Sequence, residues 1–272
     1  MSQLRIGCSG WAYKDWTGPF YPPGTRDKDR LEHYAACFDT AEINASFYRL
    51  PSEQTVEGWA RRAPAGFVFA WKVSRFITHN KKLKDCEAPV ALVFGRMAPL
   101  AEHHGPALIQ LPPQLRRNDA RLAGFLQLLP KGRRHAVEFR HASWYAPEVF
   151  RILADFDAAL CLSDHHAAPA PWERTASWIY IRGHGPGGRY FGRYDRAELS
   201  RWADHIARWR AEGRDVYAYF DNDVKSAAPF DAQALMALTG AQAYRGVAPR
   251  PAARSGAAAP TIPFSLQPNR PI

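Results

Sequence analysis

The stretch His135-Ala-Val-Glu-Phe-Arg-His-Ala-Ser-Trp144 decides how this chain can fold. Side chains two residues apart along a β-strand point to the same side. Val137 and Phe139 therefore share one face, and Glu138 and Arg140 share the other. A glutamate and an arginine on one buried face are costly to desolvate unless they are paired or used. This stretch alone is consistent with a structural ion pair and with a functional site.

The composition is that of a globular protein with a basic balance. The chain has 272 residues, which suits one large domain or two small ones, and 46% of them are hydrophobic. The formal net charge of +10 favours anionic partners such as nucleic acid or phosphorylated metabolites. The arginines are spread along the sequence without a basic block, so charge alone does not identify a partner.

The cysteines and the N-terminus favour a reduced, cytoplasmic protein. None of Cys8, Cys37, Cys86 and Cys161 belongs to a CxxC pair, which argues against a zinc ribbon. Cys8 and Cys161 lie in apolar strand-like runs, and we expect them to be core residues. The N-terminus lacks the apolar region of a signal peptide, and no apolar run approaches the length of a membrane span. We therefore expect no membrane partner.

Strand-like and helix-like segments alternate along the chain. Strands are predicted at 4–9, 40–47, 67–74, 107–111, 136–140, 159–163, 179–182 and 216–220. Helices are predicted at 29–38, 89–102, 118–129, 146–156, 195–212 and 231–238, with another that opens at Ser52. The segment 75–87 is predicted to be a loop.

This alternation predicts an α/β fold with a parallel sheet and helices outside it. Eight such units in about 245 residues favour a single parallel eight-stranded (β/α)8 TIM-type barrel, and a doubly wound open sheet is the alternative. No GxGxxG or GxxxxGK[ST] motif supports a nucleotide-binding fold. We assign residues 1–245 to the barrel domain. Residues 246–272 form an irregular Pro/Ala-rich C-terminal tail that we expect to be extended or disordered.

Polar side chains recur on the less apolar face of each predicted strand. In a parallel barrel that face fills the interior, and active sites gather at the C-terminal ends of the strands. In strand order, the assignment places at one mouth Ser9, Trp11, Glu42, Asn44, Lys72, Ser74, Gln110, Glu138, Arg140, Asp164, Arg182, His184, Tyr219 and Asp221. Every strand delivers a polar or ionisable group, so the sequence predicts a functional site there.

Ordered motifs along the chain resemble those of a known family. They are Gly7-Cys-Ser-Gly-Trp-Ala-Tyr13, Glu42-Ile-Asn-Ala-Ser-Phe-Tyr48, Gln110-Leu-Pro-Pro113, Glu138-Phe-Arg-His-Ala-Ser-Trp144, Arg182-Gly-His-Gly185 and Tyr219-Phe-Asp-Asn222. Together they resemble the YecE-like family, domain of unknown function 72, over roughly residues 4–240. The resemblance implies a TIM-type barrel related in shape to the xylose-isomerase-like and endonuclease IV-like group, and it implies no settled reaction.

One position departs from the family pattern. The last strand of the family usually ends in a Phe-Asn-Asn type run, and here it reads Phe220-Asp-Asn222. Asp221 therefore adds a negative charge to the mouth. Whether the group there acts as an amide or as a carboxylate stays open.

The first functional hypothesis is an enzyme. The candidate catalytic residues are Glu42 or Glu138 as general base, His184 as acid, and Asp221. Cations around an anion suit a hydrolase or lyase acting on a phosphate-bearing substrate, which includes nucleic acid. The candidate substrate-binding residues are Ser9, Trp11, Tyr13, Asn44, Tyr48, Lys72, Gln110, Arg140, Trp144, Asp164, Arg182, Tyr219 and Asn222.

The second hypothesis is a non-catalytic nucleic-acid-binding barrel. Aromatic residues interleaved with Arg and Lys suit base stacking combined with phosphate contact. The aromatic residues at or just beyond the strand ends are Trp11, Tyr13, Trp16, Phe47, Tyr48, Trp144 and Tyr219. For each of them, packing at the barrel mouth is the competing interpretation.

A metal is not favoured. Glu, Asp and His at strand ends can bind Mn or Zn, but only His184 is well placed, with His79 and His141 available from loops. The mouth cations compete for the same carboxylates. The sequence names no cofactor, and the absence of a Gly-x-Ser-x-Gly elbow argues against a serine nucleophile. The glycine-rich stretch Gly183–Gly188 follows a strand at a common phosphate-binding position of barrels.

Overall fold

The computed structural model describes residues 2–241 and contains one eight-stranded parallel sheet in the order β1-β8-β7-β6-β5-β4-β3-β2. The strands are β1 (Leu4–Cys8), β2 (Thr40–Ile43), β3 (Val68–Lys72), β4 (His104–Gln110), β5 (His135–Glu138), β6 (Ala159–Ser163), β7 (Ile179–Gly183) and β8 (Val216–Phe220). The predicted TIM-type barrel is confirmed. The tail predicted at 246–272 lies outside the described residues.

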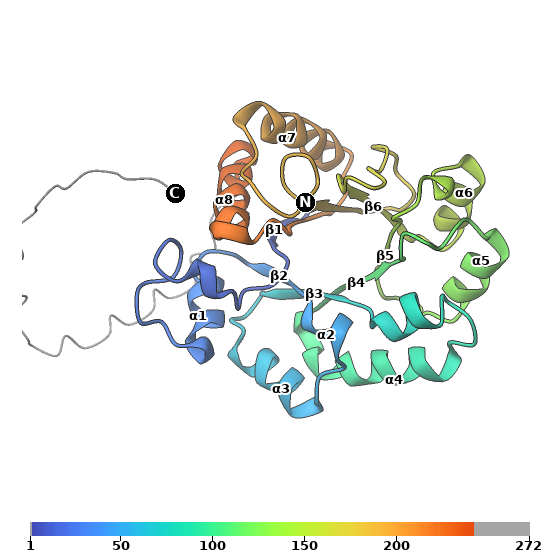
Figure 1. Cartoon of the computed structure of the whole chain (residues 1–272), viewed down its shortest axis with the longest axis horizontal. Helices are drawn as coiled ribbons and strands as arrows, with labels where there is room; N and C mark the ends of the chain where they lie inside the picture. The colour runs from blue at the N-terminus through green and yellow to red at the C-terminus, as the bar shows by residue number, and fades with distance from the viewer. Residues whose placement is uncertain (1, 242–272) are drawn as a thin grey trace, which may run out of the picture.

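Helices surround the strands in a ring (Figure 1). They are α1 (Arg30–Ala35), α2 (Ala45–Tyr48), α3 (Glu53–Arg62), α4 (Glu87–Met97), α5 (Asp119–Gln127), α6 (Pro147–Asp155), α7 (Arg196–Ala211) and α8 (Ala227–Thr239). Within residues 2–241, none of these helices combines the length and apolarity needed to cross a bilayer.

Side-chain caps explain where several helices begin. The Ser52 hydroxyl accepts the Thr55 N–H, and the Asn118 side chain accepts the Arg121 N–H at 2.9 Å. Each cap satisfies a backbone donor that the first helical turn leaves free. Asp29 precedes α1 and is a residue type that commonly caps helices, but its carboxylate pairs with Arg26 instead and makes no cap bond.

Three local expectations are corrected. The strand predicted at 40–47 ends at Ile43, and α2 follows it. The Ser46 hydroxyl donates to the Lys72 carbonyl oxygen at 2.7 Å, which ties α2 to the end of β3 through a contact distant in sequence. The predicted loop 75–87 contains a π-helical turn at Phe76–Asn80, and α8 begins at Ala227 rather than at 231.

The barrel closes at a seam between β1 and β2. Among the described residues these strands share one parallel bridge, Ser9 to Glu42, and the Gly10 N–H donates to the Glu42 carbonyl oxygen at 2.8 Å. All other neighbouring strand pairs form longer ladders.

A tyrosine from α1 completes this seam below the bridge. The Tyr34 hydroxyl accepts the Cys8 N–H at 2.7 Å and donates to the Thr40 carbonyl oxygen at 2.9 Å. A Cβ atom on Gly7 would lie 2.3 Å from that same carbonyl oxygen, so only glycine permits the approach. The Tyr34 hydroxyl thus links a backbone N–H of β1 to a backbone carbonyl of β2, in place of a direct hydrogen bond between the strands.

We expect Tyr34→Phe to lower the free energy of unfolding by about 1–3 kcal/mol, because the substitution leaves a buried N–H and a buried carbonyl without a partner. Urea denaturation measures the change. The matched control is Tyr48→Phe, which removes the same atom from an exposed side chain and should cost less than about 0.5 kcal/mol. Equal effects of the two substitutions would show that the two hydrogen bonds of the Tyr34 hydroxyl do not stabilise the seam.

Candidate functional site

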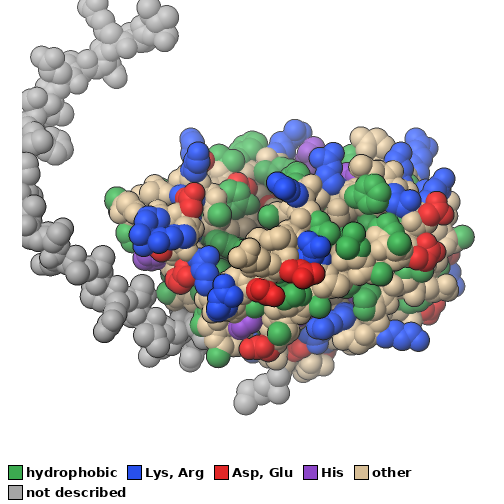
Figure 2. All heavy atoms as spheres, turned by 90° about the horizontal axis from the view of Figure 1, so that it is seen from below, with side chains coloured by type: hydrophobic (Ala, Val, Ile, Leu, Met, Phe, Trp, Pro, Cys, Tyr) green, Lys and Arg blue, Asp and Glu red, His purple; other side chains and the backbone are tan. Residues whose placement is uncertain are grey.

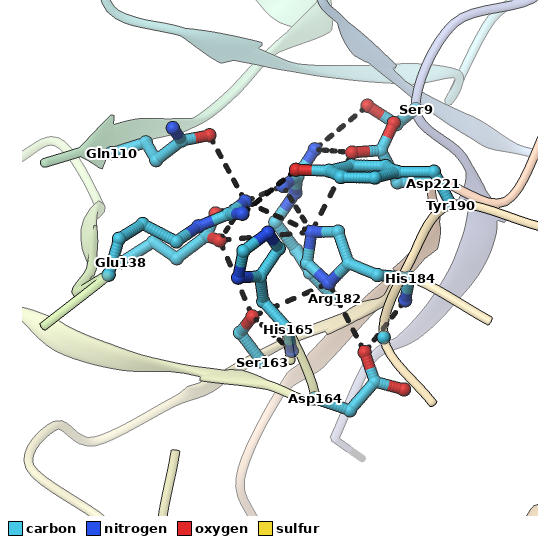
Figure 3. Close-up of polar contacts among 12 residues, drawn as sticks. Ser9, Gln110, Glu138, Ser163, Asp164, His165, Arg182, His184, Tyr190 and Asp221 are labelled. Carbon is cyan, nitrogen blue, oxygen red and sulfur yellow. Dashed lines mark hydrogen bonds and ion pairs between the residues drawn. The ribbon is translucent and has the colours of Figure 1, made fainter. Parts of the chain in front are cut away.

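Arg182 lies at the centre of the mouth and is fully buried. Its Nη2 donates to Glu42 Oε1 and to Asp221 Oδ2, both at 2.8 Å, and its Nη1 donates to Glu138 Oε2 at 2.9 Å. Figure 3 shows Arg182 together with Glu138 and Asp221. One guanidinium on β7 therefore holds carboxylates delivered by β2, β5 and the end of β8.

A second guanidinium reinforces this arrangement. Arg140 forms an ion pair with Glu138 and donates to the Tyr190 hydroxyl at 2.8 Å and to Gln110 Oε1 at 3.3 Å. Burial alone would raise the pKa of Glu138, but Arg140 and Arg182 hold that pKa well below its usual range. Glu138 therefore stays ionised and is a weak base.

Glu42 is also fully occupied. Its Oε2 accepts the Tyr180 hydroxyl at 2.6 Å, and its Oε1 accepts the Ser9 hydroxyl in addition to Arg182. Neither Glu42 nor Glu138 has exposed surface. These two candidate bases are buried counterions of the arginines, and hydrogen-bond donors of the protein occupy their lone pairs.

His184 is held as a neutral imidazole. Its Nε2 lies 3.0 Å from Arg182 Nη1 and 3.1 Å from Arg140 Nη2, and a guanidinium can only donate. Nε2 is therefore an acceptor, and the Nδ1 proton faces Asp164 Oδ1 at 3.1 Å. Burial, with both arginines, lowers the pKa of His184 well below its usual range. The predicted acid lacks the second proton that it would need to donate.

The sequence assigned Asp164 to the inward face at the end of β6, and the structure places Ser163 there instead. Ala159 and Cys161 pack inside the barrel, so Ser163 continues that face, and its hydroxyl donates to Glu138 Oε1 at 3.3 Å. Asp164 leaves the strand on the opposite side. Its carboxylate turns back to accept the backbone N–H of His184 at 2.7 Å, and burial raises its pKa to about 6.

A pocket of about 760 Å³ opens at the mouth, next to this ion-pair cluster. The predicted site residues that line it are Tyr13, Asn44, Tyr48, Lys72, Gln110 and Asp221. Residues that the sequence analysis had not assigned to substrate, and that also line it, are Phe47, Arg75, His79, Tyr190 and Asp223. The lining therefore combines a lysine, an arginine, two aspartates and several aromatic rings.

Lys72 is the buried cation of this pocket that has no carboxylate contact. Its side chain is 6% exposed, and its Nζ lies 4.2 Å from the centre of the Phe47 ring. It forms no ion pair with any carboxylate of residues 2–241. Burial, together with the charge of Arg182, lowers the pKa of Lys72 to about 8.

Two aspartates face the same pocket from the end of β8. Burial raises the pKa of Asp221 above its usual value despite the opposing charges of Arg182 and Lys72. Burial and then the charge of Asp221 raise the pKa of Asp223 to about 6. Asp223 was not among the residues predicted from the sequence, although it continues the alternation Tyr219, Asp221 by one further step.

Trp144, Tyr219 and Asn222 are among the predicted substrate-binding residues that do not line the pocket. Trp144 is fully buried, stacks on Phe139 at 4.9 Å, and donates from Nε1 to a backbone carbonyl. Tyr219 lies inside the barrel, with its hydroxyl 2.7 Å from Thr40 Oγ1. The Asn222 amide donates to a buried aspartate and to a carbonyl. Packing or hydrogen bonds within the protein hold all three in place, and the buried Asn222 Oδ1 has no hydrogen-bond partner among residues 2–241.

Other groups were missed or lie elsewhere. Tyr190 comes from the glycine-rich loop, where no periodic pattern could assign it a direction. Tyr180 precedes Arg182 by two residues on β7, so the alternation contained the signal for it. Trp11 lines a neighbouring pocket. Within residues 2–241, no three His, Cys, Asp or Glu side chains are grouped so that they could hold a metal ion.

The family model described as "Protein of unknown function DUF72" matches residues 5–255. The chain belongs to this family. The family description assigns no reaction to its members, so it does not say what the polar barrel mouth does.

Relatives and solved structures agree with this assignment. The chain is similar to the UPF0759 protein YunF of Bacillus subtilis, at 24% identity over 91% of this chain and 98% of YunF. It is 31% identical to the UPF0759 protein YecE of Escherichia coli over 53% of this chain and 50% of YecE. The crystal structure of a DUF72 family protein from Thermotoga maritima has the same fold, with a TM-score of 0.80, 24% identity, and coverage of 88% of this chain and 99% of that one.

We expect Arg182→Met to lower the free energy of unfolding by about 3–5 kcal/mol, because it leaves three buried carboxylates without their shared counterion. Arg174→Met is the control, since Arg174 pairs with Glu212 at the exposed surface and should contribute at most about 1 kcal/mol. Urea denaturation at neutral pH measures both. An Arg182→Met loss as small as that of the control would refute the central role of Arg182.

Proposed function

We propose that this DUF72 barrel is a hydrolase or lyase acting on a small substrate that bears a phosphate or similar anionic group. The observation that carries the proposal is the Lys72 ammonium, which is buried in the mouth pocket without a carboxylate contact among the described residues. A buried charge without a partner is costly, and an anionic ligand would offset that cost.

The other two mouth cations support this assignment by contrast. Arg182 and Arg140 are bound to carboxylates of the protein itself, and neither lines the pocket. Arg75 does line the pocket and adds a second positive charge near the entrance. In this proposal Lys72 contacts the anion, while Arg140 and Arg182 hold the carboxylates in place.

The acid–base roles pass to the aspartates of the pocket. A general acid or base works best when its pKa lies near the working pH. Asp223, with a pKa of about 6, suits protonation of a leaving group, and Asp221 suits removal of a proton from water or substrate. Glu42, Glu138 and His184 then act as positioning residues for Arg182, in place of the catalytic roles expected from sequence.

The nucleic-acid-binding alternative has less support. Trp16, Phe47, Trp144 and Tyr219 are buried, so they cannot serve as stacking platforms for successive bases. On the face that Figure 2 shows, Lys and Arg side chains are interspersed with acidic and apolar ones and form no continuous basic stripe. Tyr48 is the strongly exposed aromatic residue of the mouth, at 68%.

We expect sulfate to bind in the mouth with an affinity that falls as pH rises through about 8. Lys72 is charged below its pKa and loses its proton above it, whereas sulfate keeps its charge over this range. Isothermal titration calorimetry should give a decline in affinity that approaches about tenfold per pH unit above 8. A weaker decline is expected near pH 6, where Asp223 of the same pocket becomes ionised.

Two variants separate Lys72 from other basic groups. Lys72→Met should weaken sulfate binding at every pH, and Lys72→Arg should retain binding above pH 8 because an arginine stays charged there. An affinity that is the same at neutral and alkaline pH in the parent protein, or unchanged in Lys72→Met, would exclude Lys72 as the anion-binding group.

We expect the parent protein to cleave at least one member of a panel of phosphate monoesters and diesters. Asp221→Asn and Asp223→Asn should each lower kcat by about 100-fold or more, as loss of a general acid or base does. Release of phosphate or of the alcohol measures the rate. Asp204→Asn, an exposed change on α7, is the control. Full activity in both pocket variants would overturn the acid–base assignment.

A further inference from the structure

A second pocket of about 370 Å³ adjoins the mouth pocket, and aromatic side chains line it. Trp11 and Trp59 meet edge to face in its wall, with ring centres 6.0 Å apart and planes at 87°. Tyr13 and the buried Ile43 complete the apolar part of the lining. Walls of this kind suit the faces of a flat ring.

The charged groups of this second pocket are already paired within the protein. Arg62 donates to Glu32 Oε2 at 2.8 Å, and Asp27 forms an ion pair with Arg30 at 3.0 Å. Neither needs a charge from a ligand. The pocket therefore suits a neutral ring, in contrast to the mouth pocket with its unpaired lysine.

The two pockets share part of their lining, namely Tyr13, Asn44 and Ala45. At this junction the Asn44 Oδ1 atom is buried and has no hydrogen-bond partner among residues 2–241. The Asn44 Nδ2 atom lies 3.5 Å from Asp221 Oδ1, so the amide is oriented by the acid of the mouth. A buried acceptor without a donor is a site where a ligand hydroxyl or N–H would be recognised.

We propose that the substrate carries a planar, neutral ring joined through a hydrogen-bond donor to its anionic group. The ring occupies the second pocket and packs against the wall formed by Trp11 and Trp59, the donor meets Asn44 Oδ1, and the anion lies at Lys72. This inference rests on the proposed function, because it assigns the substrate class of the same mouth. A nucleoside monophosphate has the required order of ring, hydroxyl-bearing sugar and phosphate.

Adenosine 5′-monophosphate and ribose 5-phosphate test the inference, since both carry the sugar and the phosphate and the second has a hydroxyl in place of the planar base. Calorimetry should show the nucleotide binding at least about tenfold more tightly than the sugar phosphate, as expected for burial of a ring against aromatic walls. Trp59→Ala should weaken nucleotide binding about three- to tenfold and leave sulfate and ribose 5-phosphate unchanged. Unchanged sulfate binding also shows that the variant is folded.

Trp172→Ala is the matched control, because Trp172 is a partly exposed tryptophan that lines neither pocket and should not affect any probe. Equal affinities for the two probes, or a nucleotide affinity indifferent to Trp59→Ala, would overturn the ring pocket while leaving the anion site intact. Failure of sulfate and ribose 5-phosphate to bind, or binding insensitive to Lys72→Met, would instead overturn the proposed function.

Discussion

The guanidinium of Arg182 contacts three carboxylates inside the barrel, and the arrangement of the mouth depends on these contacts. Charges in a protein interior interact far more strongly than in water, so each of these groups must have a partner or change its protonation state. The planar fork of arginine can contact several carboxylates at once, which an ammonium does not do with the same geometry. Arg182 thereby fixes the relative positions of β2, β5, β7 and the end of β8 at the mouth.

This ion-pair cluster divides the mouth into two parts with different properties. In the buried part, neighbouring donors occupy the acceptor atoms of Glu42, Glu138 and His184. These groups are therefore poorly suited to proton transfer. The pocket-facing part, built on Lys72, Asp221 and Asp223, contains groups whose pKa values burial has moved towards neutrality. Residue type alone could not separate these two parts, because both contain carboxylates at strand ends.

The alternation of side chains predicted the barrel and most of its inward face, and it failed where both faces of a strand were alike. In β6, Leu160 and Leu162 point outward while Ala159 and Cys161 point inward, so apolar character gave no contrast and Asp164 was chosen over Ser163. The strand at β2 was extended too far because the residues of α2 are compatible with a strand. The bond from the Ser46 hydroxyl to the Lys72 carbonyl, which holds α2 against β3, is a tertiary contact that no local pattern predicts. Tyr190 lies in a loop, where direction depends entirely on tertiary contacts.

The seam bridged by Tyr34 bears on the order in which the chain can assemble during synthesis. The ladder of β1 is formed with β8, so that Leu4 is paired with Val216. Within residues 2–241, backbone pairing of this edge with the adjacent β2 is limited to one bridge, supplemented by the two hydrogen bonds through the Tyr34 hydroxyl. β1 therefore lacks its main hydrogen-bonding partner until β8 has been synthesised. The β2–β7 segment can pair strand by strand as it appears, whereas closure of the ring is a late, non-local step.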